Sequence, residues 1–244
     1  IHLKTGQTKY DNILKDKKII ITGGSEGIGY AMAKKFIDEG ASVVITGRSE
    51  EKLNSASKKI NNQNLHTIKW DVSDISLLKT NISNCIELLG GLDVFINNAA
   101  YLAHYSREID FYDKTMDTNL KAVYYICNFV SEWFVKNNND LGGKIINISS
   151  INSYQSSAHP YYISKSGLNA ITRGFAKEYA NKNIIINGIA SGYCCSSINL
   201  IDVEKNAFCD ISKNRRIIVP EEIAEIATFL ISDAANGIVG QTIV

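Results

Sequence analysis

Short apolar runs alternate with segments of helical periodicity along the whole chain. The apolar runs, each typical of a buried strand, are 18–22, 42–46, 65–69, 93–97, 144–149, 184–189 and 242–244. The segments with helical spacing lie near 27–39, 50–61, 75–89, 110–136, 161–181 and 220–231. This alternation predicts right-handed βαβ crossovers, and therefore an α/β fold with a doubly wound parallel sheet and helices on both faces. Ligands of such sheets bind beyond the carboxyl ends of the strands.

The first apolar run ends in a glycine turn that leads into a helix. Gly23, Gly27 and Gly29 allow a tight turn and a close approach of the backbone to a phosphate group, and the N–H groups and dipole of the first helical turn favour an anion. The pattern TGGSEGIG at 22–29 lacks the Lys-Ser/Thr pair of an ATP-type phosphate loop and is not GxGxxG. We expect a nucleotide phosphate here; a turn without a ligand is the alternative.

Composition and charge narrow the class of protein. A chain of 244 residues suits one α/β domain, with 1–17 as a polar lead-in and 193–219 as a candidate substrate lid. Lys and Arg number 26 against 25 Asp and Glu, without long blocks of one sign, which argues against nucleic acid and membrane-surface partners. No apolar run reaches the roughly 18 residues of a membrane span, and we expect a cytoplasmic protein. Five cysteines without CxxC spacing predict reduced thiols and no metal site.

Residues after the second, third and fourth apolar runs are candidates to contact the adenosine part of a dinucleotide. After the second run, an acid would accept from a ribose 2′-hydroxyl, whereas Arg would pair with a 2′-phosphate. Arg48 therefore favours NADP over NAD, although Glu26 would repel that phosphate if it pointed inward. Asp71 could hold the adenine amino group with Val72 on the ring; the alternative is that this segment is a helix cap, with Ser73 or Asp74 before the helix near 75–89. Asn98 lies where the backbone must pass beside a ligand.

A second candidate site follows the fifth apolar run, which ends in two serines at 149–150. Tyr161 and Lys165 are four residues apart and therefore share one face of a helix. An adjacent ammonium favours phenolate, so Lys165 would bring the pKa of Tyr161, ordinarily near 10, toward working pH. Tyr30 and Lys34 have the same spacing. We choose the later pair because the two serines stand just before it, and we interpret the earlier pair as helix surface.

Over residues 15–244 the sequence resembles the short-chain dehydrogenase/reductase family. The family's motifs occur in order, as TGGSEGIG at 22–29, WDVSD at 70–74, NNAA at 97–100, TNLKA at 118–122, INISS at 146–150, YYISK at 161–165 and INGIASG at 186–192. The resemblance implies a single-domain Rossmann-like fold of about seven strands. It also implies an NADP- or NAD-dependent oxidoreductase for a small carbonyl compound or secondary alcohol. A homo-oligomer, either a dimer or a tetramer, is implied as well.

The resemblance also implies roles for individual residues. Tyr161 would protonate the carbonyl oxygen as hydride arrives, while Lys165 lowers the tyrosine's pKa and holds the nicotinamide ribose. Ser150 would hydrogen-bond the same oxygen, with Ser149 as the alternative, and Asn119 would hold a water of the proton relay. The expected cofactor-binding residues are Gly23, Ser25, Glu26, Gly27, Ile28, Gly29, Arg48, Asp71, Val72, Asn98, Tyr161, Lys165, Gly192, Cys194 and Ser196.

Two other functions stay open. One is a nucleotide-sugar epimerase or dehydratase, since such enzymes also use a Tyr and a Lys four apart. They resemble TGxxGxxG, however, and need a longer carboxyl-terminal substrate domain. The other is a nucleotide-bound scaffold that has lost turnover, because a fold does not fix a function.

The substrate is expected to lie under the 193–219 segment. Apolar side chains there would cover it, Arg215 and Arg216 could meet an anionic group or simply be solvated, and Tyr101, His104 and Tyr105 would form the opposite wall. This mixture favours a compact, oxygen-rich substrate over a long acyl chain, and 197–213 is expected to be mobile without ligand. The apolar residues of the 193–219 segment that would cover the substrate are Ile198, Leu200, Ile201, Val203 and Phe208.

Overall fold

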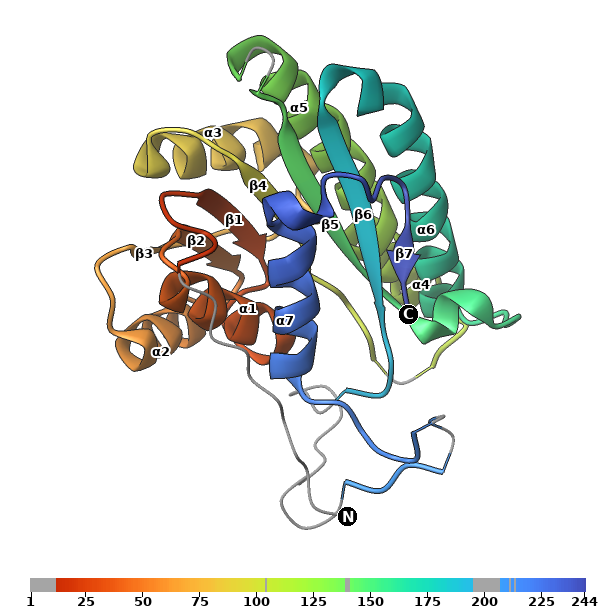
Figure 1. Cartoon of the computed structure of the whole chain (residues 1–244). Coiled ribbons are helices and arrows are strands. Elements are labelled where there is room, and N and C mark those ends of the chain that lie inside the picture. The colour runs from red at the N-terminus through yellow and green to blue at the C-terminus, as the bar shows by residue number, and fades with distance from the viewer. Residues whose placement is uncertain (1–11, 104, 139–140, 195–206, 211, 213) are drawn as a thin grey trace.

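The chain folds around a seven-stranded parallel sheet. The computed structural model describes residues 12–103, 105–138, 141–194, 207–210, 212 and 214–244. The strand order is β3-β2-β1-β4-β5-β6-β7, and every neighbouring pair is parallel (Figure 1). The strands are β1 (Lys18–Thr22), β2 (Ser42–Gly47), β3 (Leu65–Lys69), β4 (Val94–Asn97), β5 (Gly143–Ser150), β6 (Ile184–Ser191) and β7 (Thr242–Ile243). The predicted doubly wound α/β fold is confirmed.

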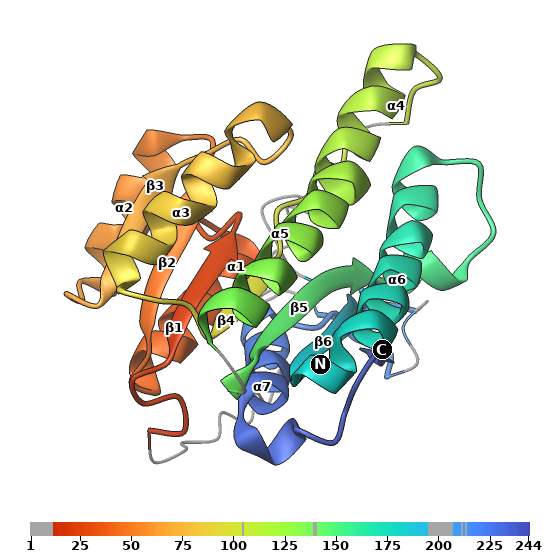
Figure 2. The same ribbon diagram turned by 90° about the horizontal axis from the view of Figure 1, so that it is seen from above.

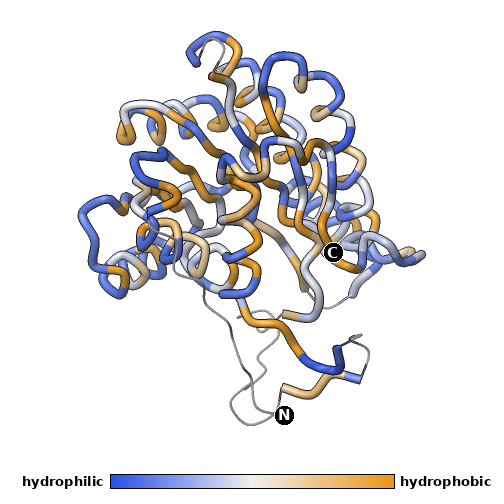
Figure 3. Tube along the Cα trace, in the orientation of Figure 1, coloured by the Kyte–Doolittle hydropathy of each residue, from blue (hydrophilic) through white to orange (hydrophobic). Residues whose placement is uncertain are grey.

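Helices cover both faces of the sheet. Helices α1, α2 and α7 pack on one face, whereas α3, α5 and α6 pack on the other (Figure 2). Such a sheet is buried on both sides, which is why its strands read as continuous apolar runs. Figure 3 shows hydrophobic positions gathered in the interior and hydrophilic ones on the outer helical turns. The helices are α1 (Gly27–Asp38), α2 (Glu50–Ile60), α3 (Leu78–Leu89), α4 (Ile109–Met116), α5 (Ala122–Asn137), α6 (Pro160–Tyr179) and α7 (Pro220–Ile231).

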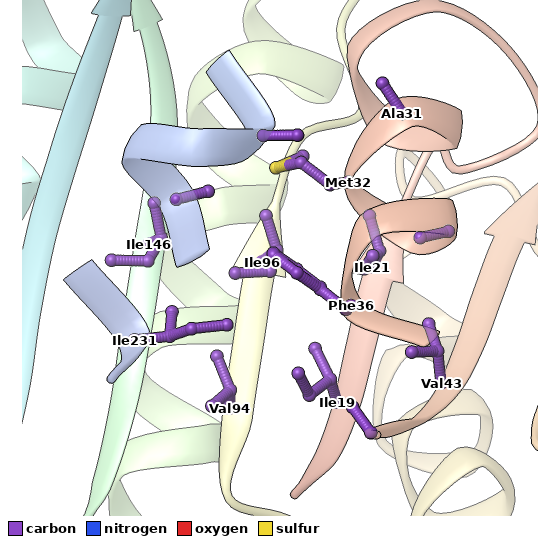
Figure 4. Close-up of a cluster of buried hydrophobic side chains, with 14 of the residues drawn as sticks. Ile19, Ile21, Ala31, Met32, Phe36, Val43, Val94, Ile96, Ile146 and Ile231 are labelled. Carbon is purple, nitrogen blue, oxygen red and sulfur yellow. The ribbon is translucent and has the colours of Figure 1, made fainter. Parts of the chain in front are cut away.

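The larger hydrophobic cluster lies between the sheet and helices α1 and α7. Phe36 of α1 and Ile231 of α7 are at most 1% exposed and lie over Ile19, Val94 and Ile96 of the central strands (Figure 4). Full burial of such a side chain contributes roughly 1.5–3 kcal/mol. This packing fixes the start of α1 relative to the strand ends, and so positions the glycine turn.

Two expected elements differ in detail from the sequence-based ranges. The segment expected as one helix near 110–136 is α4 and α5 joined by a π-helical turn, Asp117–Lys121. The helix expected from 75 begins as a 3₁₀ turn, Ile75–Leu77, that Asp74 caps by accepting from the Ser76 N–H at 3.0 Å. Apolar spacing does not distinguish these variants, because all three helix types bury a similar stripe. Among the described residues, no helix is long and apolar enough to span a membrane.

Candidate active site

A glycine turn connects β1 to α1 at the point where the strand order reverses between β1 and β4. Gly23 has φ +67°, and a Cβ on it would lie 2.9 Å from Ala99 Cα. A Cβ on Gly29 would lie 2.3 Å from Gly23 O. The turn therefore needs glycine for both conformation and close packing, and it leaves the backbone N–H groups at the start of α1 accessible to an anion.

The turn is tied to the end of β4 by hydrogen bonds. The Asn98 side-chain amide donates to Thr22 O and Gly23 O, each at 2.9 Å. The hydroxyl of Thr22 accepts from the backbone N–H groups of Asn98 and Ala99, each at 3.1 Å. The N–H groups of the Asn98 amide thus hold the glycine turn in place. Its expected contact with a cofactor remains a prediction.

A cavity of about 610 Å³ runs along the carboxyl ends of the strands, from the glycine turn to α6. Gly29 and Asn119 are not among the residues that line it, and Ser196 falls outside the described residues. The other expected residues all line the cavity, namely Gly23, Ser25, Glu26, Gly27, Ile28, Arg48, Asp71, Val72, Asn98, Ser150, Tyr161, Lys165, Gly192 and Cys194.

The cavity end next to β2 carries an ion pair that the sequence did not reveal. Lys52 Nζ lies 3.0 Å from each carboxylate oxygen of Glu26, so the negative charge that would oppose a 2′-phosphate is compensated. Arg48 is exposed at the same cavity end. Lys52 lies in the first turn of α2, just after Arg48 and the N-cap Ser49, and this closeness in sequence was the available signal for Lys52.

Asp71 makes a local turn of its own. Its Oδ1 accepts from the N–H of Ser73 at 3.0 Å and from the Ser73 hydroxyl at 2.7 Å. The helix cap is supplied by Asp74 instead. The side chain of Asp71 is exposed and lines the cavity beside the buried Val72. Of the two expected capping residues, Asp74 caps and Ser73 does not.

At the other cavity end, α6 brings Tyr161 and Lys165 against the end of β5. Lys165 is 3% exposed, donates from Nζ to Ile148 O at 2.8 Å, and lies 5.6 Å from the centroid of the Tyr161 ring. The Ser150 side chain is hydrogen-bonded to Tyr161, whereas the Ser149 hydroxyl donates to Lys165 O at 3.4 Å. Successive strand residues point to opposite faces, and this alternation brings Ser150 to the phenol.

The pKa of Tyr161 shifts in the direction opposite to the sequence-based expectation. Burial raises the pKa of the Tyr161 phenol, and the hydrogen bond with Ser150 opposes that shift only in part. Burial also lowers the pKa of Lys165 to about 8. In this structure the ammonium is directed to Ile148 O. Desolvation, which disfavours each charged form, therefore outweighs the expected effect of Lys165 on the phenol.

Asn119 lies on the π-helical turn and is 1% exposed. Its Oδ1 accepts from the Tyr101 N–H at 2.7 Å, and its Nδ2 donates to Tyr101 O at 2.9 Å and to the Ser164 hydroxyl at 3.3 Å. The side chain thus joins the loop after β4 to α6. Single π turns are frequent at functional sites; the expected water contact of Asn119 stays a prediction.

Arg216, expected either to meet an anionic group or to be solvated, is paired with a carboxylate of its own chain. Its guanidinium makes two hydrogen bonds to the carboxylate of Glu222, at 2.8 and 2.5 Å, and Glu222 also accepts from the Val219 N–H at 3.0 Å. This network fixes the start of α7. Arg215 is exposed. Of the apolar lid residues only Phe208 is described; Ile198, Leu200, Ile201 and Val203 lie outside the described residues, as do most of 197–213 and His104.

The expected opposite wall contains a histidine that sequence reasoning missed. Tyr101 lines the cavity, and Tyr105 is half exposed with its ring centroid 4.9 Å from that of His159. His159 directly precedes α6 and lies 6.5 Å from the Tyr161 ring. A histidine followed by proline at the start of a predicted helix was the available signal, because such a position is an N-cap.

A doubly wound sheet with a glycine turn at its switch point and, at the same edge, a partly buried Tyr beside a buried Lys defines a class of nucleotide-dependent oxidoreductases. The sequence model of the family described as short chain dehydrogenase matches residues 17–205, and the chain belongs to this family. Members use a nicotinamide cofactor, and the protein is an oxidoreductase that transfers hydride. The epimerase or dehydratase alternative is not favoured.

Several known proteins are similar over nearly the whole chain. The "3-oxoacyl-[acyl-carrier-protein] reductase FabG" of Chlamydia trachomatis is 32% identical over 243 residues, which cover 95% of this chain and 96% of that protein. The "Dehydrogenase/reductase SDR family member 4" of Bos taurus is 30% identical over 246 residues, which cover 96% of this chain and 87% of that protein. Both similarities extend beyond the matched family segment toward the ends of the chain.

Solved structures agree with this assignment. A short chain dehydrogenase from Bacillus anthracis superimposes with a TM-score of 0.84 at 30% identity, covering 94% of this chain and 95% of that one. A 3-ketoacyl-(acyl-carrier-protein) reductase from Brucella melitensis, complexed with NADH, gives a TM-score of 0.86 at 23% identity, covering 94% and 96%. At that identity the second similarity concerns the fold alone.

Proposed function

We propose that the protein prefers NADP and interconverts a small carbonyl compound and its secondary alcohol, with Tyr161 as the general acid and base. One observation carries the proposal: Tyr161, Lys165 and Ser150 lie at one end of a cavity whose other end is the glycine turn. A dinucleotide is long enough to require both ends. This arrangement supports phosphate binding at the glycine turn and proton transfer at the other end.

The side chains at the cavity fit a nicotinamide dinucleotide. The glycine turn is a cradle that any Cβ at Gly23 or Gly29 would disrupt. The indole N–H of Trp70, which lines the cavity, is a buried donor without a hydrogen-bond partner among the described residues. Lys165 carries three donors, so it can hold a ribose hydroxyl in addition to Ile148 O. The bound cofactor would supply the hydride.

Tyr161 would give its proton to the carbonyl oxygen in reduction and take it back in oxidation, while the Ser150 hydroxyl holds that oxygen. Reduction needs the neutral phenol, and burial raises the pKa of Tyr161, so this form persists through neutral pH. Oxidation needs the phenolate, and its rate should increase with pH. Preorganised donors at a developing charge are a large contribution to catalysis.

The preference for NADP rests on the charges near β2. Arg48 and Lys52 both line this cavity end, and Glu26 is paired with Lys52. The pair leaves Arg48 as an exposed positive group available to a 2′-phosphate, and no acid stands at Gly47 to accept from a 2′-hydroxyl. NAD remains the other possible cofactor.

We further propose that the chain is a single domain that assembles into a dimer or a tetramer and works in the cytoplasm. Exposed aromatic side chains of α4 and α5 support an assembly through these helices, since Tyr112, Tyr124 and Tyr125 are each 46–49% exposed. Light scattering at several protein concentrations tests the assembly; a monomer at every concentration contradicts it.

A substrate survey tests the function. The protein is incubated with NADPH, and then with NADH, and with a panel of ketones, aldehydes and acyl thioesters, while absorbance at the reduced nicotinamide band is followed. Turnover that disappears in Tyr161→Phe supports the proposal. Binding of cofactor without turnover on the whole panel favours the scaffold alternative. Because similar proteins are named 3-oxoacyl-[acyl-carrier-protein] reductase, the panel includes long-chain thioesters, and their efficient reduction contradicts a compact substrate.

A further inference from the structure

The peptide N–H of Tyr161 is held by a titratable side chain. His159 is the N-cap of α6, and its Nδ1 accepts from the Tyr161 N–H at 3.0 Å. Pro160 at the next position has no N–H. The N–H groups of Tyr162 and Ile163 reach the backbone oxygen of His159, at 3.0 and 3.2 Å. The first N–H of the helix is therefore that of Tyr161, and its partner is an imidazole nitrogen.

An imidazole can accept at Nδ1 only while it is neutral. In that state the proton is on Nε2, whereas the imidazolium carries a proton on both nitrogens and is donor only. Protonation would set two donors against each other at 3.0 Å and place a positive charge at the positive end of the helix dipole. The usual caps Ser, Thr, Asp and Asn do not change in this way near neutral pH.

The ring of His159 is partly buried among aromatic side chains. Its centroid lies 4.9 Å from Tyr105, 5.5 Å from Phe111 of α4, 6.5 Å from Tyr161 and 5.6 Å from Tyr162. His159 thus contacts the ring of Tyr161 as well as accepting from its N–H. These two contacts link the state of the cap to the position of Tyr161.

The polar and titratable groups around the ring do not favour its charged form. From the loop before α4, Arg107 Nε donates to the Tyr105 hydroxyl at 3.3 Å. The Ser157 hydroxyl accepts from the backbone N–H of His159 at 3.1 Å and does not contact the ring nitrogens. The α6 side contributes the Tyr161 and Tyr162 phenols. Partial burial lowers the pKa of His159, which favours the neutral ring.

We propose that His159 is a positioning residue that holds Tyr161 in place only while its imidazole is neutral, so that protonation of this ring slows the reaction at acid pH. The proposal rests on the proposed role of Tyr161. It assigns the acid limb of the pH profile to His159, since the pKa of Lys165 is about 8 and that of Tyr161 is raised, which puts both on the alkaline side.

Protonation of His159 should also lower the stability of the fold at acid pH. A histidine whose pKa is lowered by folding contributes stability that is fully present above its ordinary pKa of about 6.5 and is lost as the pH falls toward the lowered folded value. Thermal unfolding at pH 7.5 and 5.5 separates loss of the fold from loss of positioning. Rates are compared only where all variants remain folded.

The kinetic test uses His159→Asn, since Asn is a good cap that does not titrate. With cofactor saturating, kcat of the unmutated protein should fall as the pH drops through the lowered pKa of His159, and should level off about fivefold lower, which is the cost of losing the cap. The fall should be absent in His159→Asn. His159→Ala should lower kcat about fivefold across the range through loss of the cap. His66→Asn, on β3, is the matched control and should retain the acid limb.

A spectroscopic test needs no substrate. In protein labelled with ¹⁵N-tyrosine, the Tyr161 amide resonance should move with pH as the imidazole titrates, and should stay fixed over that range in His159→Asn. An acid limb retained by His159→Asn, no limb down to pH 5 in the unmutated protein, or a Tyr161 amide that does not titrate would each overturn the proposal. A protein without turnover contradicts the proposed function alone, because the resonance still reports on the cap.

Discussion

The starts of α1 and α6 carry the same Tyr-x-x-x-Lys spacing in different surroundings. At α1, Lys34 is 58% exposed in its side chain and pairs with Asp38 at 2.9 Å, while Tyr30 packs partly buried against the core cluster. At α6, Lys165 is 3% exposed and donates to Ile148 O, near the carboxyl end of β5. The helix brings each Lys near its Tyr, but only α6 presents the pair to a cavity.

The difference shows which part of a motif carries chemistry. Spacing of four residues requires only an α-helix. Burial, the carboxyl end of β5 and the Ser150 hydroxyl are supplied by the tertiary fold, and they alter the pKa of both Lys165 and Tyr161. The α1 start contributes differently, through the backbone of its glycine turn. We therefore expect α6 variants to act on kcat and variants near α1 and β2 on cofactor binding.

The largest contrast should come from the two tyrosines. Tyr161→Phe removes the proton donor and almost no volume, so kcat should fall by about 10²–10⁴-fold while cofactor affinity changes little. Tyr30→Phe should leave kcat unchanged. Steady-state kinetics and a cofactor titration of both variants measure this. Near-normal kcat in Tyr161→Phe, or its loss in Tyr30→Phe, would reverse the choice between the pairs.

Lys165→Ala should impair both chemistry and binding. The change removes a buried ammonium that would hold the cofactor ribose and leaves Ile148 O without its donor, so kcat/KM should fall on the order of 10²-fold. Cofactor affinity should weaken about tenfold or more. The unmutated protein should also bind cofactor less tightly as the pH rises through about 8, where Lys165 loses its charge. Isothermal titration of the cofactor at pH 7 and pH 9 checks this. Equal affinities at the two pH values would contradict a role for the Lys165 charge in cofactor binding.

The two serines at the end of β5 provide a sharper comparison within one strand. Ser150→Ala should lower kcat about 10- to 100-fold, because the hydrogen bond with Tyr161 and with the substrate oxygen is lost. Ser149→Ala removes only the 3.4 Å bond to Lys165 O and should cost less than about threefold. Steady-state kinetics of both variants at one pH show which serine acts with Tyr161. A larger loss of kcat in Ser149→Ala would assign that role to Ser149.

Arg48→Ala should act on the cofactor and not on kcat. A charge-assisted bond to a 2′-phosphate contributes roughly 1.5–3 kcal/mol, or about 10- to 100-fold in affinity. The variant should therefore lose the preference for NADPH while NADH binding is unchanged. Titration of both cofactors measures it, with Arg215→Ala, an exposed arginine in the segment before α7, as the control. Tighter binding of NADH by the unmutated protein would contradict the NADP preference.

Sequence patterns predicted the layers, the strand positions and most cavity-lining residues, since these depend on local periodicity and on strand ends meeting at one edge. They did not predict contacts between side chains distant along the chain. The Glu26–Lys52 ion pair, for example, joins residues 26 apart. Nor did the patterns predict the pair between Arg216 and Glu222, which are only six apart but lie in a loop and at a helix start. The π turn at Asn119 was also missed, because its apolar stripe matches that of an α-helix.

The smallest effect should come from the other member of the α1 pair. Lys34→Ala removes an exposed i,i+4 contact with Asp38, and such pairs contribute about 0.3–0.5 kcal/mol to stability. The cost is largely offset because Ala is the best helix former. The variant should therefore melt within about a degree of the unmutated protein and keep its kcat and its cofactor affinity. A calorimetric scan with steady-state kinetics measures all three quantities. A loss of activity without a loss of stability would show that the α1 pair takes part in function, and the contrast between the two helix starts would then fail.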